Sequence, residues 1–143
     1  MFHYISKIIL IFAFFFSNIA MITSQEKHTL TLGFEGMKSS KGNLYIALYN
    51  AEKSFLKTPF KGVIVKVIAK KASAEITNIP TGTYAVSVFH DENDNKKMDT
   101  NFLGIPKEPT GISNNAKGFM GPPKYKDAKF DIIQPMKMSI RIK

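Results

Sequence analysis

Residues 84–90 read YAVSVFH, and in this run the side chains Tyr, Val, Val and His alternate with Ala, Ser and Phe. A period of two indicates a β-strand with one buried face. Residues 44–49, LYIALY, are apolar on both faces, which is typical of a central strand between two layers. Alternation of the same kind recurs outward from these two runs, in residues 30–34, 63–68, 72–77, 128–132 and 136–142.

These seven short runs predict an all-β protein. Turn-forming residues separate them, including Lys-Gly-Asn at 41–43 and Pro-Thr-Gly at 80–82. The best candidate for a helix, residues 51–56, is long enough for only one or two turns. The sequence therefore predicts one domain, residues 25–143, folded as an about seven-stranded immunoglobulin-like or transthyretin-like sandwich with one long loop.

The long loop is the segment from residue 91 to residue 126, which has no strand pattern and is rich in Asn, Asp, Gly, Pro and Lys. Connections longer than roughly 15 residues are uncommon in compact domains and are usually functional or disordered. The apolar side chains within this segment are expected to fasten it to the sandwich. They are Phe102, Leu103, Ile105, Ile112, Phe119 and Tyr125.

Residues 91–99, DENDNKKMD, carry oxygen-bearing side chains at the spacing that opens an EF-hand-type calcium loop. Ca²⁺ prefers carboxylate, amide and carbonyl oxygens, so this pattern predicts a calcium site. The expected ligands are the side chains of Asp91, Asn93, Asn95 and Asp99, together with the backbone carbonyl of Lys97.

Two positions depart from the calcium-loop pattern. Lys96 stands where the loop normally has a glycine, and Phe102 stands where it normally has a bidentate glutamate. A missing carboxylate would have to come from Asp94, Glu108 or Asp127. The alternative interpretation is a turn in which Asp and Asn side chains bond to their own backbone, and both interpretations remain open.

Of two functional classes, an enzyme and a non-enzymatic module, the enzyme is the less supported by the sequence. A nucleophilic set would need His90 with Ser113 and an aspartate of the loop, but the side chains of residues 90 and 91 point to opposite faces of a strand. The chain has no Cys, and therefore neither a disulfide nor a cysteine nucleophile, and it has no Trp to stack against a sugar. A non-enzymatic module is favoured, and a hydrolase that uses His90 with loop carboxylates is the alternative.

Residues 1–24 have the organisation of a secretory signal peptide, with Lys7 before a nine-residue apolar run at 8–16. That run is shorter than the about 20 residues that a membrane-spanning helix needs. We therefore expect an exported protein, periplasmic or secreted, with no stable membrane insertion after cleavage.

The chain is basic, with 20 Lys and Arg against 11 Asp and Glu. No lysine run is dense enough to follow a nucleic-acid backbone, and exported proteins rarely meet nucleic acid. Weak attraction to anionic envelope surfaces explains the charge more simply. The expected partner is an envelope component or a small ligand, and the protein is expected to be a monomer.

Residues 79–130 resemble an exported bacterial family, domain of unknown function 2141. The shared motifs are P-x-G-x-Y-A-V-x-V at 80–88, H-D-x-N-x-N at 90–95, G-x-P-x-E-P-x-G-x-S-N-N-A at 104–116 and G-P-P at 121–123, with G-x-L-x-I-A-L-Y at 42–49 upstream. The resemblance implies an exported immunoglobulin-like or transthyretin-like sandwich without an established activity. The family usually has Asn-Gly-Lys where this chain has Asn-Lys-Lys at 95–97.

The shared loop motifs concentrate oxygen-bearing side chains in a segment with few regular backbone pairs. These side chains either bond to one another and fix the shape of the loop, or they face a ligand. The candidate ligand-binding residues are His90, Asn101, Glu108, Ser113, Asn114 and Asn115.

Overall fold

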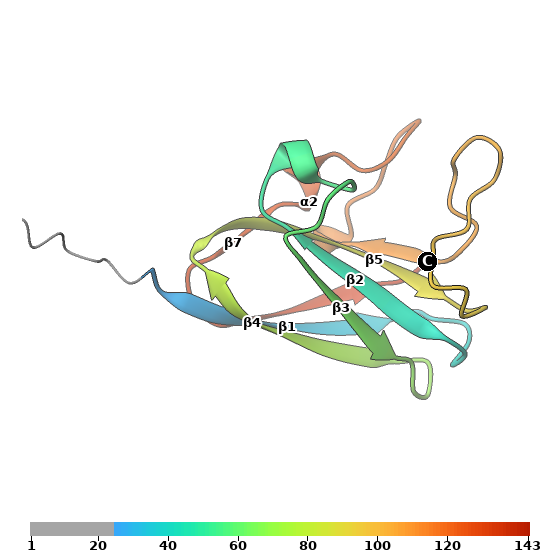
Figure 1. Cartoon of the computed structure of the whole chain (residues 1–143), viewed down its shortest axis with the longest axis horizontal. Helices are drawn as coiled ribbons and strands as arrows, with labels where there is room; N and C mark the ends of the chain where they lie inside the picture. The colour runs from blue at the N-terminus through green and yellow to red at the C-terminus, as the bar shows by residue number, and fades with distance from the viewer. Residues whose placement is uncertain (1–24) are drawn as a thin grey trace, which may run out of the picture.

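The computed structural model describes residues 25–143, so the signal peptide expected at residues 1–24 lies outside the described part. Two β-sheets face each other across one core (Figure 1). The first sheet contains β1 (Lys27–Glu35), β4 (Ala72–Pro80) and β8 (Met136–Arg141). The second contains β2 (Asn43–Tyr49), β3 (Lys61–Lys66), β5 (Gly82–Asp91), β6 (Thr110–Ile112) and β7 (Phe130–Ile132). Within residues 25–143, no helix is long and apolar enough to cross a bilayer.

The strand order is β4-β1-β8 in one sheet and β3-β2-β5-β6 in the other. All neighbours are antiparallel except β1 and β8, which run parallel. Both β6 and β7 pair with the same edge of β5, β6 with residues 87–89 and β7 with residues 82–84. Residues 85 and 86 of β5 therefore have no strand partner on that edge within residues 25–143.

The core lies between the two sheets and uses alternate residues of each strand. Leu30, Leu32 and Phe34 of β1 meet the inward residues of β2 and β5 in one apolar cluster. The alternation in the sequence sets this arrangement because successive strand side chains point to opposite faces.

A smaller apolar cluster covers the outer face of the second sheet. Tyr49 and Ala85 lie there against Phe55 and Ala128. Three short helices supply its cover, namely the 3₁₀ helices η1 (Glu52–Ser54) and η2 (Ser113–Asn115) and the single-turn α2 (Tyr125–Ala128). This second cluster explains why the run LYIALY is apolar on both faces.

The predicted all-β fold in two sheets is confirmed, with eight strands rather than about seven. The additional strand, β6, lies in the segment that was predicted to lack strands, because three residues are too few to show an alternating pattern. The helix candidate at 51–56 is a 3₁₀ turn, η1.

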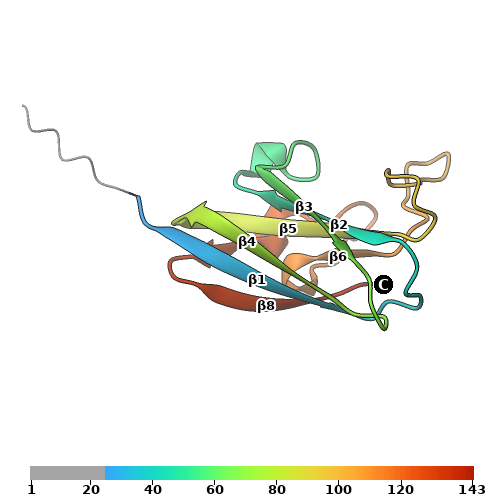
Figure 2. The same cartoon turned by 60° about the horizontal axis from the view of Figure 1, so that its bottom comes forward.

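The first part of the long loop, residues 92–109, leaves the end of β5 and projects beyond the end of the sandwich (Figure 2), and the chain then returns along β5 as β6. The prediction that its apolar side chains fasten it to the sandwich is only partly correct. Ile112 and Tyr125 do pack on the outer cluster. The other four are exposed by more than half: Phe102 at 94%, Leu103 at 68%, Ile105 at 55% and Phe119 at 91%.

Candidate functional site

The candidate site is the segment from residue 91 to residue 99, called here the Asp/Asn loop. It begins at Asp91, the last residue of β5, whose side chain is fully buried. The Asp91 carboxylate accepts hydrogen bonds from the backbone amides of Asn95, at 3.1 Å, and Lys96, at 2.8 Å. One buried carboxylate therefore holds the turn that follows it.

The loop is closed by Asp99. Its Oδ2 accepts hydrogen bonds from Nδ2 of Asn93 at 2.7 Å and from Nδ2 of Asn95 at 2.8 Å. The two asparagine Oδ1 atoms accept from backbone amides two residues further on, those of Asn95 and Lys97, at 3.1 and 3.0 Å. Asp91, Asn93, Asn95 and Asp99 are thus gathered in one small loop, and Lys97 joins it through its backbone.

Glu108 brings a further carboxylate to this loop. Its Oε2 accepts a hydrogen bond from the backbone amide of Asp99 at 3.1 Å. Its Oε1 is buried and has no hydrogen-bond partner among residues 25–143. Burial raises the pKa of Glu108 and the charges of Asp91 and Asp99 raise it further, whereas the Asp99 amide and His90 lower it.

Of the three carboxylates that could complete a calcium site, only Glu108 bonds to Asp99. Asp94 accepts a hydrogen bond from Nδ2 of Asn43 at 3.2 Å. Asp127 lies in α2, where its carbonyl accepts from Asn114. In residues 25–143, no group of three or more His, Asp or Glu side chains is placed to hold a metal ion. Amide and carbonyl oxygens would have to complete any such site.

The raised pKa of Glu108 predicts a pH dependence of the calcium-free protein. The native state holds this proton more tightly than the unfolded chain, so native stability should fall as pH rises from the ordinary glutamate pKa to the raised one. We expect Glu108→Gln, which imitates the neutral form, to lose less stability over that range. Urea unfolding in chelator at several pH values measures the difference, and parallel curves for the two proteins would contradict it.

Lys96 occupies the left-handed backbone region, with a φ of 66°. The loop thus has the conformation that a glycine normally supplies, although this chain carries a lysine there. We expect Lys96→Gly to raise the free energy of unfolding by about 1 kcal/mol, because the left-handed conformation costs a side-chain-bearing residue roughly that amount. Chemical denaturation checks this. Lys97→Gly, at a position without a positive φ, should lower stability instead.

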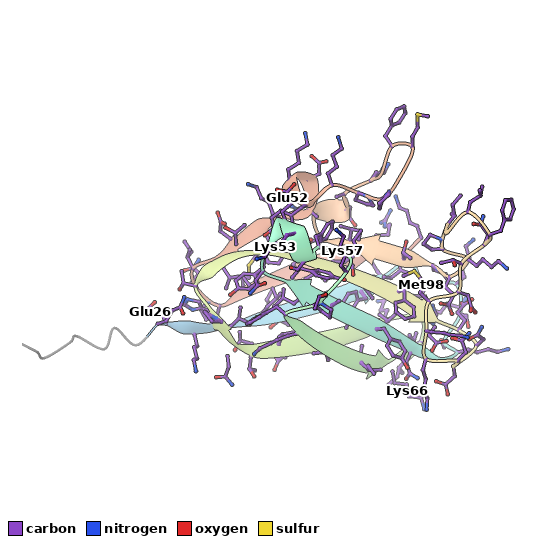
Figure 3. All side chains as sticks on the ribbon, turned by 45° about the horizontal axis from the view of Figure 1, so that its top comes forward. Glu26, Glu52, Lys53, Lys57, Lys66 and Met98 are labelled. Carbon is purple, nitrogen blue, oxygen red and sulfur yellow. The ribbon has the colours of Figure 1, made fainter. Side chains whose placement is uncertain are left out.

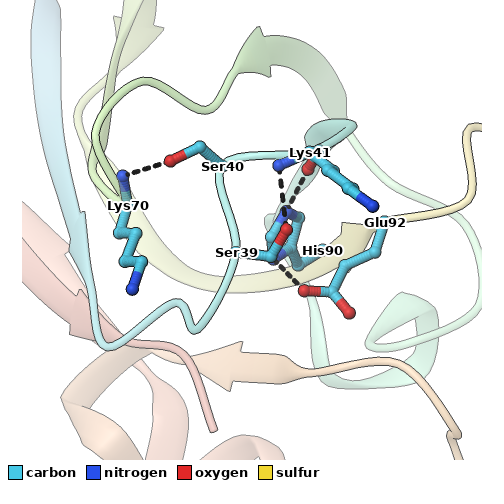
Figure 4. Close-up of polar contacts among 6 residues, drawn as sticks. All are labelled: Ser39, Ser40, Lys41, Lys70, His90 and Glu92. Atoms are coloured by element: carbon cyan, nitrogen blue, oxygen red, sulfur yellow. Dashed lines mark hydrogen bonds and ion pairs between the residues drawn. The ribbon is translucent and has the colours of Figure 1, made fainter.

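The connection between β1 and β2 supports the start of the Asp/Asn loop. His90 is fully buried, and its Nε2 donates to the carbonyl of Lys41 at 2.7 Å (Figure 4). Within the described part of the chain its Nδ1 has no hydrogen-bond partner, and it lies 3.6 Å from the Glu92 carboxylate. Gly42 lies so close to Asp91 that a Cβ at this position would stand 1.7 Å from the Asp91 carbonyl oxygen.

The negative charge of the Asp/Asn loop affects the pKa of a tyrosine on the neighbouring sheet face. Tyr45 of β2 stacks on Phe89 of β5, with the ring centroids 5.0 Å apart. Desolvation raises the pKa of Tyr45, and the negative charges of Asp91 and Asp94 raise it further. The negative charges of Asp91 and Asp94 therefore act on Tyr45 across the neighbouring sheet face.

Ser113 completes the edge of β5 where no strand covers it. Its Oγ accepts from the Val86 amide at 2.9 Å and donates to the Ala128 carbonyl at 2.6 Å. The side chain is fully buried, which leaves no access for a substrate. A single hydroxyl here replaces the backbone groups that a continuous strand would offer.

Asn114 and Asn115 also bond to the fold. Nδ2 of Asn114 donates to the Lys129 carbonyl at 2.9 Å, and Oδ1 of Asn115 accepts from the Arg141 amide at 2.9 Å. Asn101 closes a local turn, because its Oδ1 accepts from the amides of Leu103 and Ile105 at 2.9 and 3.0 Å. For these residues, bonding within the protein is the interpretation that the contacts favour over facing a ligand.

The contacts do not assemble the catalytic set that a hydrolase would need. His90 and Ser113 are both fully buried and bond to backbone groups of different elements. Two surface grooves of residues 25–143 lie elsewhere, one between residues 52–57 and 122–126 and the other between residues 35–38 and 141–143.

Sequence reasoning missed Gly42 and the Lys41 carbonyl as parts of this site. The turn at 41–43 was recognised only as a turn. Nothing local in the sequence shows that it packs against residues some fifty positions later, although a glycine in a shared motif was the available signal.

The sequence profile of one protein family matches residues 33–141, and that family is described as an uncharacterized protein conserved in bacteria, DUF2141. No curated protein and no solved structure matches the chain.

Proposed function

The chain belongs to the DUF2141 family of bacterial proteins, and from that premise we propose that it is an exported, non-enzymatic binding module of the cell envelope. In this proposal the sandwich is of the immunoglobulin-like or transthyretin-like type. Its long loop binds an envelope component or a small ligand, and a Ca²⁺ ion in the Asp/Asn loop fixes the shape of that loop.

The observation that carries the calcium proposal is the buried, unpartnered Oε1 of Glu108. A buried carboxylate oxygen without a partner is costly, and either a proton or a cation removes that cost. The negative charges of Asp91 and Asp99 also raise the pKa of Glu108, although within residues 25–143 these three side chains are not placed around one point for an ion. A divalent cation would balance their charge.

The loop geometry supports the same proposal. Lys96 adopts the positive φ that a calcium loop requires at this position, and Asp91 bonds to the amides that follow. Asp91, Asn93, Asn95 and Asp99 would supply side-chain oxygens and Lys97 its carbonyl, with Glu108 as the missing carboxylate. The role would be structural, since an ion that orders a long loop offsets conformational entropy in a chain without disulfides.

The contacts of His90 and Ser113 favour a binding module over a hydrolase. Both side chains are fully buried and bond to backbone atoms, so neither offers a free nucleophile or base to a substrate.

Thermal unfolding with millimolar Ca²⁺, compared with unfolding in chelator, tests this proposal. We expect Ca²⁺ to raise the melting temperature by several degrees, and Asp99→Asn to abolish that rise by removing one ligand charge. Asp127→Ala is the matched control, because Asp127 is an exposed aspartate away from the loop and its variant should keep the full rise. Identical melting curves with and without Ca²⁺ would contradict the calcium site.

A further inference from the structure

Two loop tips carry exposed apolar side chains. The first tip is residues 101–105, where Phe102 is 94% and Leu103 is 68% exposed. The second tip is residues 118–121, where Phe119 is 91% and Met120 is 95% exposed. Large apolar side chains are rarely gathered at full exposure without a role, so these tips mark an interaction surface.

The first tip is a hydrogen-bonded turn whose apolar side chains point outward. Asn101 is bonded on both sides, since its amide donates to the Ile105 carbonyl and its Oδ1 accepts from Leu103 and Ile105. The Gly104 amide donates to the Asn101 carbonyl at 3.0 Å. These bonds close the turn, and Phe102 projects from it into solvent.

The second tip is equally tight. Gly118 lies so close to Gly121 that a Cβ on Gly118 would stand 1.8 Å from the Gly121 carbonyl oxygen. Phe119 and Met120 form the outer end of this turn, between the two glycines. Both tips extend from the same side of the molecule, while the turn between β3 and β4 lies on the other side (Figure 1).

The surroundings of the tips are strongly basic. Residues 96–126 contain six lysines, all exposed, against only two acids, Asp99 and Glu108. Both acids are engaged within the Asp/Asn loop. Beside the second tip, a groove lined by Tyr125 and two prolines has three lysines along its sides, Lys57, Lys124 and Lys126, against one acid, Glu52. Lys66, by contrast, lies on the far side of the molecule from both tips (Figure 3).

From this arrangement we infer that the two tips insert into the surface of an anionic lipid bilayer. The inference rests on the proposed function, in which the long loop binds an envelope component, and it identifies that component as the membrane. Apolar side chains at the end of a basic surface match the acyl boundary and the negative headgroups of such a membrane.

Tryptophan emission tests the insertion directly, because the chain has no Trp of its own. We expect Phe102→Trp and Phe119→Trp in the full chain to shift their emission to shorter wavelength with vesicles of phosphatidylcholine and phosphatidylglycerol. Vesicles of phosphatidylcholine alone should cause little shift. Ile68→Trp is the control, since Ile68 is also an exposed apolar side chain beside lysines but lies in the turn between β3 and β4.

All variants contain residues 1–24, so any contribution of that segment to vesicle binding is the same in each of them. Lys117→Gln and Lys124→Gln should each weaken vesicle binding about fivefold, and Lys66→Gln should have little effect. An unchanged emission at both tips, or an equal shift at Ile68→Trp, would overturn the inference. If the tips bind a protein instead of a membrane, the emission at both tips should stay unchanged with vesicles. The calcium proposal is tested separately, since a failure of Ca²⁺ to raise the melting temperature would leave these emission shifts in place.

Discussion

Gly42→Ala is expected to lower the free energy of unfolding by about 3 kcal/mol, the sum of a backbone cost and a packing cost. Gly42 has a φ of +67°, and a Cβ there would stand 1.7 Å from the Asp91 carbonyl oxygen. The Asp91 carbonyl cannot move away from a Cβ at residue 42 without displacing the end of β5, where the Asp/Asn loop begins. Urea unfolding measures the loss.

Gly104→Ala is the matched control for this prediction. Gly104 also has a positive φ, +75°, but a Cβ there meets no atom within 4 Å. Its replacement should therefore cost only the backbone term of about 1 kcal/mol. Equal losses for the two variants would mean that the close approach of Gly42 to Asp91 contributes nothing to stability.

Ser113→Ala is expected to cost about 3 kcal/mol, because it leaves two buried backbone groups without partners. The Val86 amide and the Ala128 carbonyl both bond to the Ser113 hydroxyl in a fully buried site. No strand covers β5 at this point, so no other backbone group replaces the lost bonds. Thermal or urea unfolding measures the effect.

Ser139→Ala provides the comparison. Ser139 lies on β8 with its side chain exposed, and its replacement should change stability by less than about 0.5 kcal/mol. A small effect at Ser113 as well would contradict its role as the substitute for a strand at the edge of β5.

The two-sheet fold could be predicted from the sequence because burial acts on alternate residues. The run at 84–90 places Tyr84, Val86 and Val88 in the core and ends with the buried His90, as a period of two requires. β6 could not be predicted, since a three-residue strand acquires its identity from its pairing with β5 rather than from its own pattern.

The contents of the candidate site could be predicted only in part. The spacing of Asp91, Asn93, Asn95 and Asp99 predicted either a calcium site or a turn closed by its own side chains. In the structure these side chains bond to one another and to the backbone of the loop, and calcium binding stays a prediction. Glu108 was one of three alternatives, and only its bond to the Asp99 amide distinguishes it. Such contacts depend on tertiary packing that a single sequence does not encode locally.

The exposure of Phe102 and Phe119 was predicted wrongly for a similar reason. Composition favours burial of aromatic side chains, but the tight turns at residues 101–105 and 118–121 direct them outward. A pattern shows which side chains are apolar, and only the backbone shows which way they point.

Calcium binding by the Asp/Asn loop is tested most directly by following backbone amide resonances during a Ca²⁺ titration. The amides of Asn95 and Lys96 bond to Asp91, and that of Asp99 bonds to Glu108, so all three report on the site. We predict saturable shifts confined to this loop, with one dissociation constant of roughly 10⁻⁴ to 10⁻³ M, the range of extracellular calcium modules. Amide resonances that stay in place throughout millimolar Ca²⁺ would contradict the calcium site and leave a turn closed by its own side chains.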